Sequence, residues 1–390
     1  MSIDVRPVRT ARERRIFLTF PWYIYKDDPL WVPPLLPERA STIDREKGAW
    51  FERGDADLFI AWREDEPVGT MCAGEDRYTN ELRGRHECVF GFLDYIEDYS
   101  VFEALIATAG AWARSRNLDT LFGPFNLDYE NGYGVLIEGR DRPPTLLCGH
   151  SPPYYQGFME RHGFASARGT NIAMAIDIQE MTPQLRRLAQ LADRVRERRQ
   201  FVIREPDLDH WDDEVDRLHR LLNRALAHLP DHIGWHRSAV EALVAPFREI
   251  ADMDMVLFAD VVNAEGECET VGFLPGVPNL NEVFIHVNGL RYPWNYLRLL
   301  WDMRVRPLFG YHPACLTIKS VLVLPEYWGA GVAALLFDTM RERARAKGYA
   351  WVDLSITSED NPQTPILGER MGAEVYKRWQ VYRLGVDAVS

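Results

Sequence analysis

A strand, a glycine turn and a helix follow one another without interruption in residues 321–348, and this order constrains the fold more than any other part of the chain. The turn, WGAGVA at 328–333, contains two glycines. Glycine lets the backbone approach a ligand closely, and the start of the helix points unpaired N–H groups and a positive dipole end at the same place. The order therefore predicts a site for an anionic, phosphate-bearing cofactor.

The pattern of strands and helices around this motif occurs twice along the chain. When ALIATAGAWARSRNLDTLFG is aligned with LLFDTMRERARAKGYAWVDL, strand and helix positions keep a constant offset, which indicates two copies of one α/β unit. The first copy is expected to comprise residues 3–8, 10–25, 57–63, 68–74, 87–93, 101–116 and 119–125. The second is expected to comprise residues 201–205, 209–228, 255–263, 268–274, 315–324, 332–347 and 351–357.

The length of the chain suits two domains. With 390 residues and 46% hydrophobic content, each half can bury a core of its own. We expect domains at 1–180 and 201–390, joined at 181–200 by a helix with an apolar stripe and arginines opposite it. The alternative for that stripe is a basic helix for nucleic acid or membrane, but a net charge of −13 argues against wrapping nucleic acid.

Composition also bears on the compartment. The five cysteines are odd in number and lack CxxC spacing, so neither a disulfide framework nor a zinc knuckle is indicated. The first residues carry charge from the fourth position, unlike a signal peptide. No segment reaches the roughly 18 apolar residues of a membrane span. We expect a cytoplasmic protein, either soluble or in peripheral contact with a membrane.

The second copy resembles the GNAT acyl-CoA N-acyltransferase superfamily, whose turn reads Gln/Arg-x-x-Gly-x-Gly/Ala. The glycine spacing at 328–333 matches, with Trp328 in place of the usual basic or amide side chain. Downstream, Asn361, Leu367 and Gly372 fit the family pattern Asn-x-x-Ala-x-x-Leu-Tyr-x-x-x-Gly-Phe. The resemblance implies an α/β fold with a mixed α+β sheet in two tandem GNAT-like domains, and acyl-CoA or acetyl-CoA as co-substrate.

The resemblance also implies which residues bind that co-substrate. The central strand would pair its backbone with the pantetheine arm, and the turn amides would hold the diphosphate; the alternative is an ordinary strand-to-helix loop. The residues so implied are Val321, Val323, Gly329, Ala330, Gly331, Val332, Ala333 and Asn361.

Two departures from the family pattern matter for function. The first copy has the carboxylates of Asp94, Glu97 and Asp98 where a diphosphate would sit, so it resembles a degenerate GNAT domain that has lost the cofactor loop. In the second copy, Gly368 stands where many relatives place a tyrosine that protonates the departing thiolate. That position therefore supplies no general acid.

Candidate bases lie in loops. His228, His232 and His236 recur at intervals of four, but Pro230 and Gly234 interrupt the helix that a metal site would need, so no metal is predicted. His232 is the candidate base, with a solvated loop histidine as the alternative.

Other polar positions also have two interpretations. Glu282, together with His286, either faces the acceptor or lies on the surface. Asp353, Ser355 and Thr357 make one face of their strand polar, either lining a gap between the central strands or meeting water.

Residues 290–309 combine tryptophans and leucines with arginines. We expect a helix docked against the other domain. A membrane interface or the mouth of an acyl tunnel are the alternatives.

The function that fits best is an acyl-CoA-dependent N-acyltransferase, which moves an acetyl or longer acyl group to the amine of a small molecule or lipid precursor. The alternative is a non-catalytic acyl-CoA-binding or scaffold protein. Nucleotide binding in a Rossmann sheet is weaker, since the turn lacks G-x-G-x-x-G.

Overall fold

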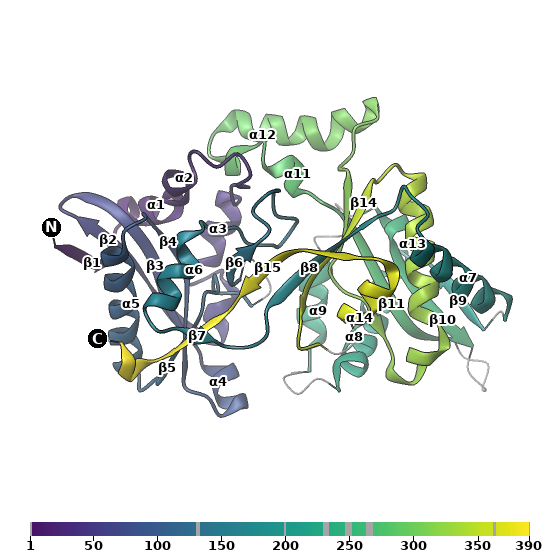
Figure 1. Ribbon diagram of the computed structural model, residues 1–390, viewed down its shortest axis with the longest axis horizontal. Helices are drawn as coiled ribbons and strands as arrows, with labels where there is room; N and C mark the ends of the chain where they lie inside the picture. The colour runs from purple at the N-terminus through teal and green to yellow at the C-terminus, as the bar shows by residue number, and fades with distance from the viewer. Residues whose placement is uncertain are drawn as a thin grey trace.

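Two lobes lie side by side in the computed structural model (Figure 1). Within the described residues, each lobe holds one mixed sheet flanked by helices, with seven strands in the first sheet and nine in the second. This architecture confirms the predicted α/β class with two tandem copies. The structure describes residues 2–129, 133–198, 200–228, 234–245, 252–262, 268–361 and 364–389.

The first sheet is antiparallel except for one pair. β4 and β5 run parallel, because helix α5 carries the chain back between them. In spatial order its strands are β1 (Ile3–Pro7), β2 (Gly54–Arg63), β3 (Glu66–Asp76), β4 (Glu87–Tyr95), β5 (Thr120–Gly123), β16 (Tyr382–Gly385) and β7 (Ala165–Ser166). The helices of this lobe are α1 (Ala11–Thr19), α2 (Pro21–Ile24), α3 (Leu36–Thr42), α4 (Arg77–Arg83), α5 (Tyr99–Arg114) and α6 (Tyr154–Arg161).

The second sheet repeats this plan, with β12 and β14 as its parallel pair and helix α13 between them. In spatial order its strands are β6 (Val135–Glu138), β15 (Glu374–Gln380), β8 (Asn171–Asp177), β14 (Trp351–Ser358), β12 (Cys315–Ile318), β11 (Cys268–Pro278), β10 (Val256–Val262) and β9 (Phe201–Arg204), while β13 (Leu322–Val323) pairs with β11. Its helices are α7 (Pro183–Glu197), α8 (Trp211–Leu226), α9 (Arg237–Val244), α11 (Asn281–Phe284), α12 (Pro293–Leu300), α13 (Val332–Ala346) and α14 (Thr364–Met371).

Strands cross between the lobes. The two sheets therefore do not divide at residues 180 and 200, the domain boundaries expected from the sequence. β6 and β8 precede residue 180 but lie in the second sheet. β16 lies in the first sheet, although β15, the strand just before it, lies in the second. Both ends of the chain therefore lie in the first lobe, as Figure 1 shows. The sequence of an apolar strand does not indicate which sheet the strand joins, because strand pairing depends on contacts between residues distant in sequence.

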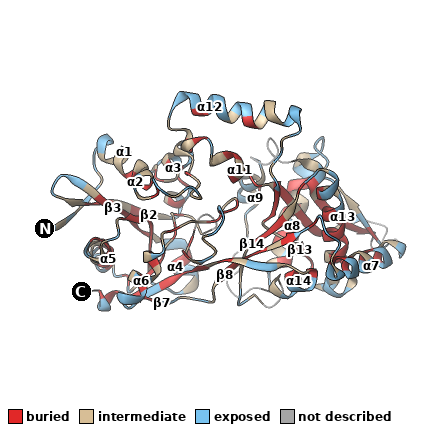
Figure 2. Ribbon diagram, turned by 45° about the horizontal axis from the view of Figure 1, so that its top comes forward, coloured by how far each residue is buried: buried red, intermediate tan, exposed pale blue. Residues whose placement is uncertain are grey.

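Helix α7 confirms the predicted apolar stripe, but it is part of the second lobe rather than a free connection. Leu185, Leu188, Ala192 and Val195 are buried in the second core, and α7 packs against α13. Figure 2 shows the buried residues concentrated along the sheets and on the faces of the helices that cover them.

Residues 290–309 correct a second expectation. Helix α12 and the turns after it extend along one side of the molecule, and most of their large apolar side chains are exposed, rather than docked on the other lobe (Figure 2). An apolar stripe predicts burial only where a partner surface exists, and periodicity does not reveal whether one does. Among the described helices, none is long and apolar enough to span a membrane.

A buried lysine marks the strand crossing. Lys377 on β15 donates from its ammonium to the carbonyl oxygens of Gly139 and Arg142, the latter at 2.7 Å. Burial lowers the pKa of Lys377 to about 8. Below that pH the charged form is buried in the folded chain but hydrated in the unfolded chain. As the pH rises toward the ordinary value, the folded lysine loses its proton first, so stability increases.

The stability of the wild-type chain relative to Lys377→Met should therefore rise with pH. Between about pH 7.5 and pH 9.5 we expect the difference in free energy of unfolding, measured by urea denaturation, to shift in favour of wild type by about 2 kcal/mol. Lys26→Met, at an exposed position, is the control and should show no such shift. A wild-type to Lys377→Met difference that stays constant with pH would contradict the burial argument.

Candidate active site

The two parallel strands of the second sheet separate halfway along their length. β12 and β14 pair only as far as Ile318 and Leu354, and beyond that point β13 pairs with β11 alone. Residues 319–321 form the break between β12 and β13. A narrow cavity fills the space between the separated strands, which we call the strand gap. Its walls include Lys319, Ser320 and Val321 of the broken strand, Ser355, Ile356 and Thr357 of β14, and Thr364, Leu367, Gly368 and Met371 of α14.

Backbone groups of the broken strand face this gap. Leu324 donates its N–H to the Val271 oxygen of β11, and peptide groups alternate sides along a strand. The peptide groups of Val321 and Val323 therefore point toward β14. The indole N–H of Trp328 donates to the Val323 oxygen at 2.9 Å, so one lone pair of that carbonyl is used within the protein.

The glycine turn lies at the start of α13. Gly331 has a φ of +86°, and a Cβ there would lie 2.6 Å from a methyl carbon of Val195, so the position requires glycine. A Cβ on Gly329 would meet nothing within 4 Å. No side chain caps α13, although Val332, the first residue of the helix, is fully buried. The predicted cradle at 329–333 is thus an uncapped helix start with free space beside it.

Asn361 stands one turn ahead of α14. Its side chain donates to Thr364 Oγ1 at 3.2 Å and accepts from the Thr364 N–H at 3.4 Å, so it organises the helix that closes the strand gap. Gly368 lies on the wall of the gap, and a Cβ there would lie 2.6 Å from the Met174 sulfur. A tyrosine would therefore not fit at this position without repacking.

The equivalent helix start in the first lobe is occupied. Asp98 caps α5 by accepting the Ser100 N–H at 2.9 Å, and its other oxygen pairs with Arg63. Hydrogen bonds from Ser100 and Arg63 hold the pKa of Asp98 below its ordinary value. The protein's own carboxylate thus takes the place that an anionic ligand would need.

A buried carboxylate contacts two residues of the strand gap's wall, Lys319 and Ser355. Asp353 on β14 has no exposed side-chain surface. It accepts hydrogen bonds from Tyr376 at 2.7 Å, Thr145 at 3.0 Å and Lys319 at 3.2 Å, and another from Ser355. Burial raises the pKa of Tyr376 well above its ordinary value, so the phenol stays protonated and donates.

Cys148 and Lys319 extend this cluster. The Lys319 ammonium lies 2.6 Å from Ser355 Oγ and 3.8 Å from the Cys148 sulfur, which is 3.4 Å from the same hydroxyl. Burial alone would lower the pKa of Lys319, but Cys148 and Asp353 outweigh it and raise the pKa. Lys319 is therefore a buried cation and a hydrogen-bond donor rather than a base.

A second, larger cavity opens on the other side of this cluster, and Cys148 belongs to its lining. It lies where β4 and β5 separate in the first sheet, past the last paired residues Val89 and Phe122. Its volume is about 280 Å³, against about 40 Å³ for the strand gap, so it has room for the larger of two ligands. We call it the large cavity.

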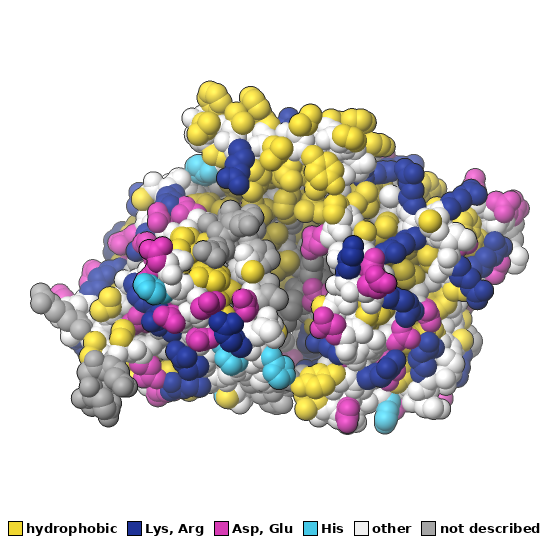
Figure 3. Space-filling view, turned by 180° about the vertical axis from the view of Figure 1, so that it is seen from behind, with side chains coloured by type: hydrophobic (Ala, Val, Ile, Leu, Met, Phe, Trp, Pro, Cys, Tyr) yellow, Lys and Arg dark blue, Asp and Glu magenta, His cyan; other side chains and the backbone are white. Residues whose placement is uncertain are grey.

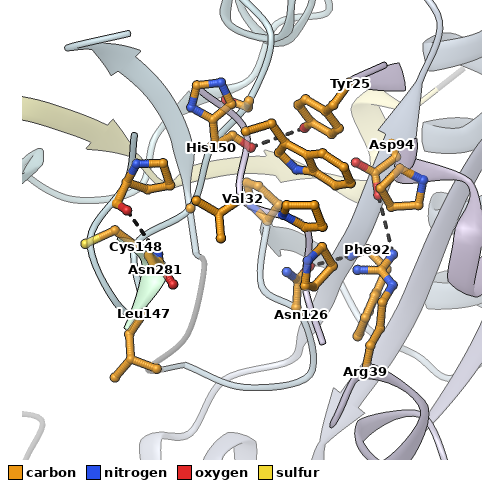
Figure 4. A pocket seen from close by; sticks show the side chains of 18 of the residues that line it. Tyr25, Val32, Arg39, Phe92, Asp94, Asn126, Leu147, Cys148, His150 and Asn281 are labelled. Atoms are coloured by element: carbon orange, nitrogen blue, oxygen red, sulfur yellow. Dashed lines mark hydrogen bonds and ion pairs between the residues drawn. The ribbon is translucent and has the colours of Figure 1, made fainter. Parts of the chain in front are cut away.

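An ion pair lies in the wall of the large cavity. Arg39 and Asp94 approach to 3.5 Å, and the guanidinium lies 4.6 Å from the centroid of the Phe92 ring (Figure 4). Burial lowers the pKa of Arg39 and raises that of Asp94, and each partner opposes the shift of the other. The Nε of Arg39 is buried and has no partner among the described residues, so it can donate to a ligand oxygen.

His150 also lines the large cavity. Its Nε2 lies 2.7 Å from an oxygen of Asp28, while its buried Nδ1 has no partner within the described part of the chain. Its backbone oxygen accepts from the Tyr25 hydroxyl at 3.2 Å (Figure 4). Burial lowers the pKa of His150, against the influence of Asp28, so the ring is neutral at neutral pH with a lone pair on Nδ1.

The structure describes only one of the two bases expected from the sequence. His232 lies outside the described residues. Glu282 accepts the N–H groups of Ala314 at 2.7 Å and Cys315 at 3.0 Å, so its carboxylate anchors the start of β12. Neither cavity has Glu282 in its lining. No cluster with the residue types of a metal site occurs among the described residues.

Sequence reasoning missed Lys319, Cys148, Tyr376 and His150. The alternation of Asp353 and Ser355 with apolar residues indicated a polar gap between the central strands. Lys319, the lysine in the neighbouring predicted strand, could have been assigned to the same gap on that basis. Cys148 and His150 come from the first half of the chain, and only the crossing of the strands brings their loop to the second sheet.

Comparisons with known proteins fit this geometry. Residues 296–372 match the model of the acetyltransferase (GNAT) family. The bacterial ceramide synthase of Caulobacter vibrioides is 27% identical over 98% of this chain and 97% of its own length. Protein YghO of Escherichia coli is 28% identical over 97% of this chain and 94% of its own.

Among solved structures, a tandem GNAT protein from the clavulanic acid biosynthesis pathway matches with a TM-score of 0.55 and 13% identity, over 99% of both chains. A GCN5-related N-acetyltransferase from Sphaerobacter thermophilus matches with a TM-score of 0.50 and 14% identity, over 98% of this chain and 96% of that one. At such identities the likeness concerns the fold. Residues 296–372 thus resemble the acetyltransferase (GNAT) family, and the chain as a whole has the fold of a tandem GNAT protein, with a first copy that lacks the glycine turn.

Proposed function

We propose that this chain is an acyl-CoA-dependent N-acyltransferase that transfers an acetyl or longer acyl group to the amine of a long-chain acceptor. The observation that carries the proposal is the strand gap, which lies beside helix α13, whose start has no side-chain cap, and which has Lys319 in its wall. A non-catalytic acyl-CoA-binding protein would need the first of these features but not the second.

The residues present fit coenzyme A. Val321 and Val323 would hold the pantetheine arm through their peptide groups, and the N–H groups at 329–333 would hold the diphosphate. Trp328 supplies no charge there, so backbone amides and the helix dipole carry the recognition. When bound, acyl-CoA provides a thioester, whose thiol has an ordinary pKa near 8.5 and is a tolerable leaving group.

Lys319 is the residue placed to assist acyl transfer. The acceptor nitrogen attacks the thioester carbonyl, a C–N bond forms, and the C–S bond breaks with the electron pair leaving on sulfur. Lys319 would stabilise the negative charge that develops on oxygen and then on sulfur, and Asp353 would hold the ammonium in position.

The proton released by the acceptor nitrogen needs a base. His150 is neutral, has an Nδ1 with no partner among the described residues and is held by Asp28, as a general base requires. The loop that carries it also carries Cys148, which contacts both Lys319 and Ser355. The linings of the large cavity and the strand gap thus contact each other through this cluster, and an acceptor in one would have to pass it to reach a thioester in the other.

The acceptor class follows from the large cavity and from a relative. The cavity wall contains Trp31, Val32 and Phe92, which suit an apolar chain, and Arg39 Nε, which suits an oxygen near the amine. The Caulobacter relative is named a ceramide synthase, and a ceramide is an N-acylated long-chain amine. Together these support a lipid amine rather than a short polar one.

Gly329→Val tests the co-substrate site without disturbing the fold. The new side chain would enter the free space beside the helix start, where the diphosphate would lie. We expect calorimetry to show at least a tenfold or so loss of CoA affinity, about 1.4 kcal/mol, with an unchanged melting temperature. Gly385→Val on β16 also meets no atom within 4 Å and should bind CoA normally. Normal binding by Gly329→Val would remove CoA from this turn.

Lys319→Met tests the chemistry. Loss of the cation should lower kcat on the order of 100-fold while the Kd for CoA changes little, because the ammonium acts on charge that develops during reaction. Since the variant leaves Asp353 buried without its cation, Lys319→Met/Asp353→Asn restores neutrality and should stay folded but equally slow. Turnover near the wild-type rate in the double variant would exclude Lys319 from the reaction.

The pH profile tests His150. Because burial lowers its pKa, kcat/KM should fall only as the pH drops below about 6.5, when the ring takes up a proton. Asp28→Asn removes the carboxylate that favours the charged ring and should move this acid limb to lower pH. His150→Gln should abolish the limb and lower kcat/KM on the order of 100-fold. An acid limb that persists unchanged in His150→Gln would assign it to another group.

A further inference from the structure

An apolar arm extends along one side of the molecule. It comprises residues 291–311, with helix α12, a π-helical turn at Trp301–Val305 and a 3-10 turn at Arg306–Phe309. At least half of the surface of six large side chains is exposed: Trp294 61%, Leu297 69%, Leu300 58%, Trp301 50%, Leu308 80% and Phe309 80%. Soluble proteins rarely leave so much contiguous apolar surface uncovered unless it binds something.

The arm keeps its shape through its own polar contacts. Asp302 has no exposed side-chain surface and accepts from Arg298 at 2.7 Å and from Arg306 at 3.3 Å. The Arg306 guanidinium also lies 3.4 Å from the centroid of the Tyr311 ring. These contacts join the helix to the turns that follow it. The arm can therefore present its apolar side chains without a partner to order them.

The charge of the arm differs from that of the rest of the chain. It carries four arginines and one aspartate, a net charge of plus three, in a chain whose net charge is −13. Arg304 is exposed, and Arg291 lies 5.0 Å from the centroid of the Trp22 ring at the base of the arm. Tryptophan, leucine and arginine on one surface are the composition of a segment that lies in a membrane interface, and the positive charge favours anionic lipids.

The arm is continuous with the large cavity. Phe284 of α11, just before the arm, lines that cavity, as does the segment from Trp31 to Leu35. The Trp22 indole donates to Asn288 at 2.6 Å, next to the root of the arm. Figure 3 shows hydrophobic side chains along the arm and below it, toward the boundary between the lobes. The apolar surface and the cavity wall thus meet on one side of the molecule.

We propose that the arm binds the interfacial region of a lipid bilayer that contains anionic lipids, with its exposed tryptophans and leucines among the acyl chains and its arginines among the headgroups. That a long-chain amine passes directly from the bilayer into the large cavity rests on the proposed function; the lipid-binding surface does not.

Vesicle flotation of the full chain tests the proposal. Wild type should float with vesicles of phosphatidylcholine and phosphatidylglycerol, less with phosphatidylcholine alone, and less at high salt. Leu308→Ser/Phe309→Ser should weaken binding about tenfold or more, and Arg304→Glu should weaken it only for the anionic vesicles. All these side chains are exposed, so melting temperatures should not change.

A matched control lies on the opposite side of the molecule. Tyr78→Ser/Leu82→Ser removes two exposed apolar side chains from α4, which Figure 1 places far from α12, and should float like wild type. Absence of flotation in wild type, or equal flotation of the Leu308→Ser/Phe309→Ser variant, would overturn the proposal. The proposal would also be overturned if neither protein floats and light scattering shows a wild-type dimer that the Leu308→Ser/Phe309→Ser variant does not form. The surface would then pair two copies of the chain.

Measurements of turnover test the proposed function independently of the lipid-binding surface. With a water-soluble short amine as acceptor, the Leu308→Ser/Phe309→Ser variant should keep the wild-type rate, since the arm contributes no group to the reacting centre. Flotation of wild type without turnover on any amine would contradict the proposed function and leave the lipid-binding surface supported.

Discussion

A buried carboxylate holds the two halves of this chain together at the proposed reaction centre. Asp353 has no exposure to water, so its charge must be balanced by donors. One donor, Lys319, stands at the break where the central strand leaves β14, and another, Thr145, comes from a loop of the first half. The same contacts thus fix the cation in the strand gap and bring Cys148 and His150, on that loop, close to it. The site therefore depends on both copies, although only one resembles a complete GNAT domain.

Both copies have a gap between their parallel strands, but the two gaps suit different ligands. In each sheet the parallel strands separate after a few pairs, at Ile318 in one and Val89 in the other. The helix start beside the opening is uncapped in the second copy and capped by Asp98 in the first. Electrostatics alone then directs an anionic ligand to the second copy. The first copy, with its wider cavity and aromatic walls, is left for a different ligand.

The sequence predicted what is local and missed what depends on contacts distant along the chain. The glycine turn, helices α5, α7, α8 and α13 and the hairpins followed from periodicity and turn chemistry, because neighbouring residues determine them. The crossing of β8 and β16 between sheets did not, since an apolar strand fits either sheet. Cys148 and His150 depend on that crossing, so their role was hidden. The sequence did not predict the exposure of the arm either, because the same stripe of leucines suits a buried core and a membrane surface.

The most direct test of the central claim is release of free CoA thiol from a long-chain acyl-CoA after addition of a long-chain amine in mixed micelles, with the product identified by mass spectrometry. The account predicts one equivalent of thiol for each equivalent of N-acyl amide. Tight binding of acyl-CoA without thiol release across short and long amines would contradict it, and would assign the chain to acyl-CoA binding without catalysis.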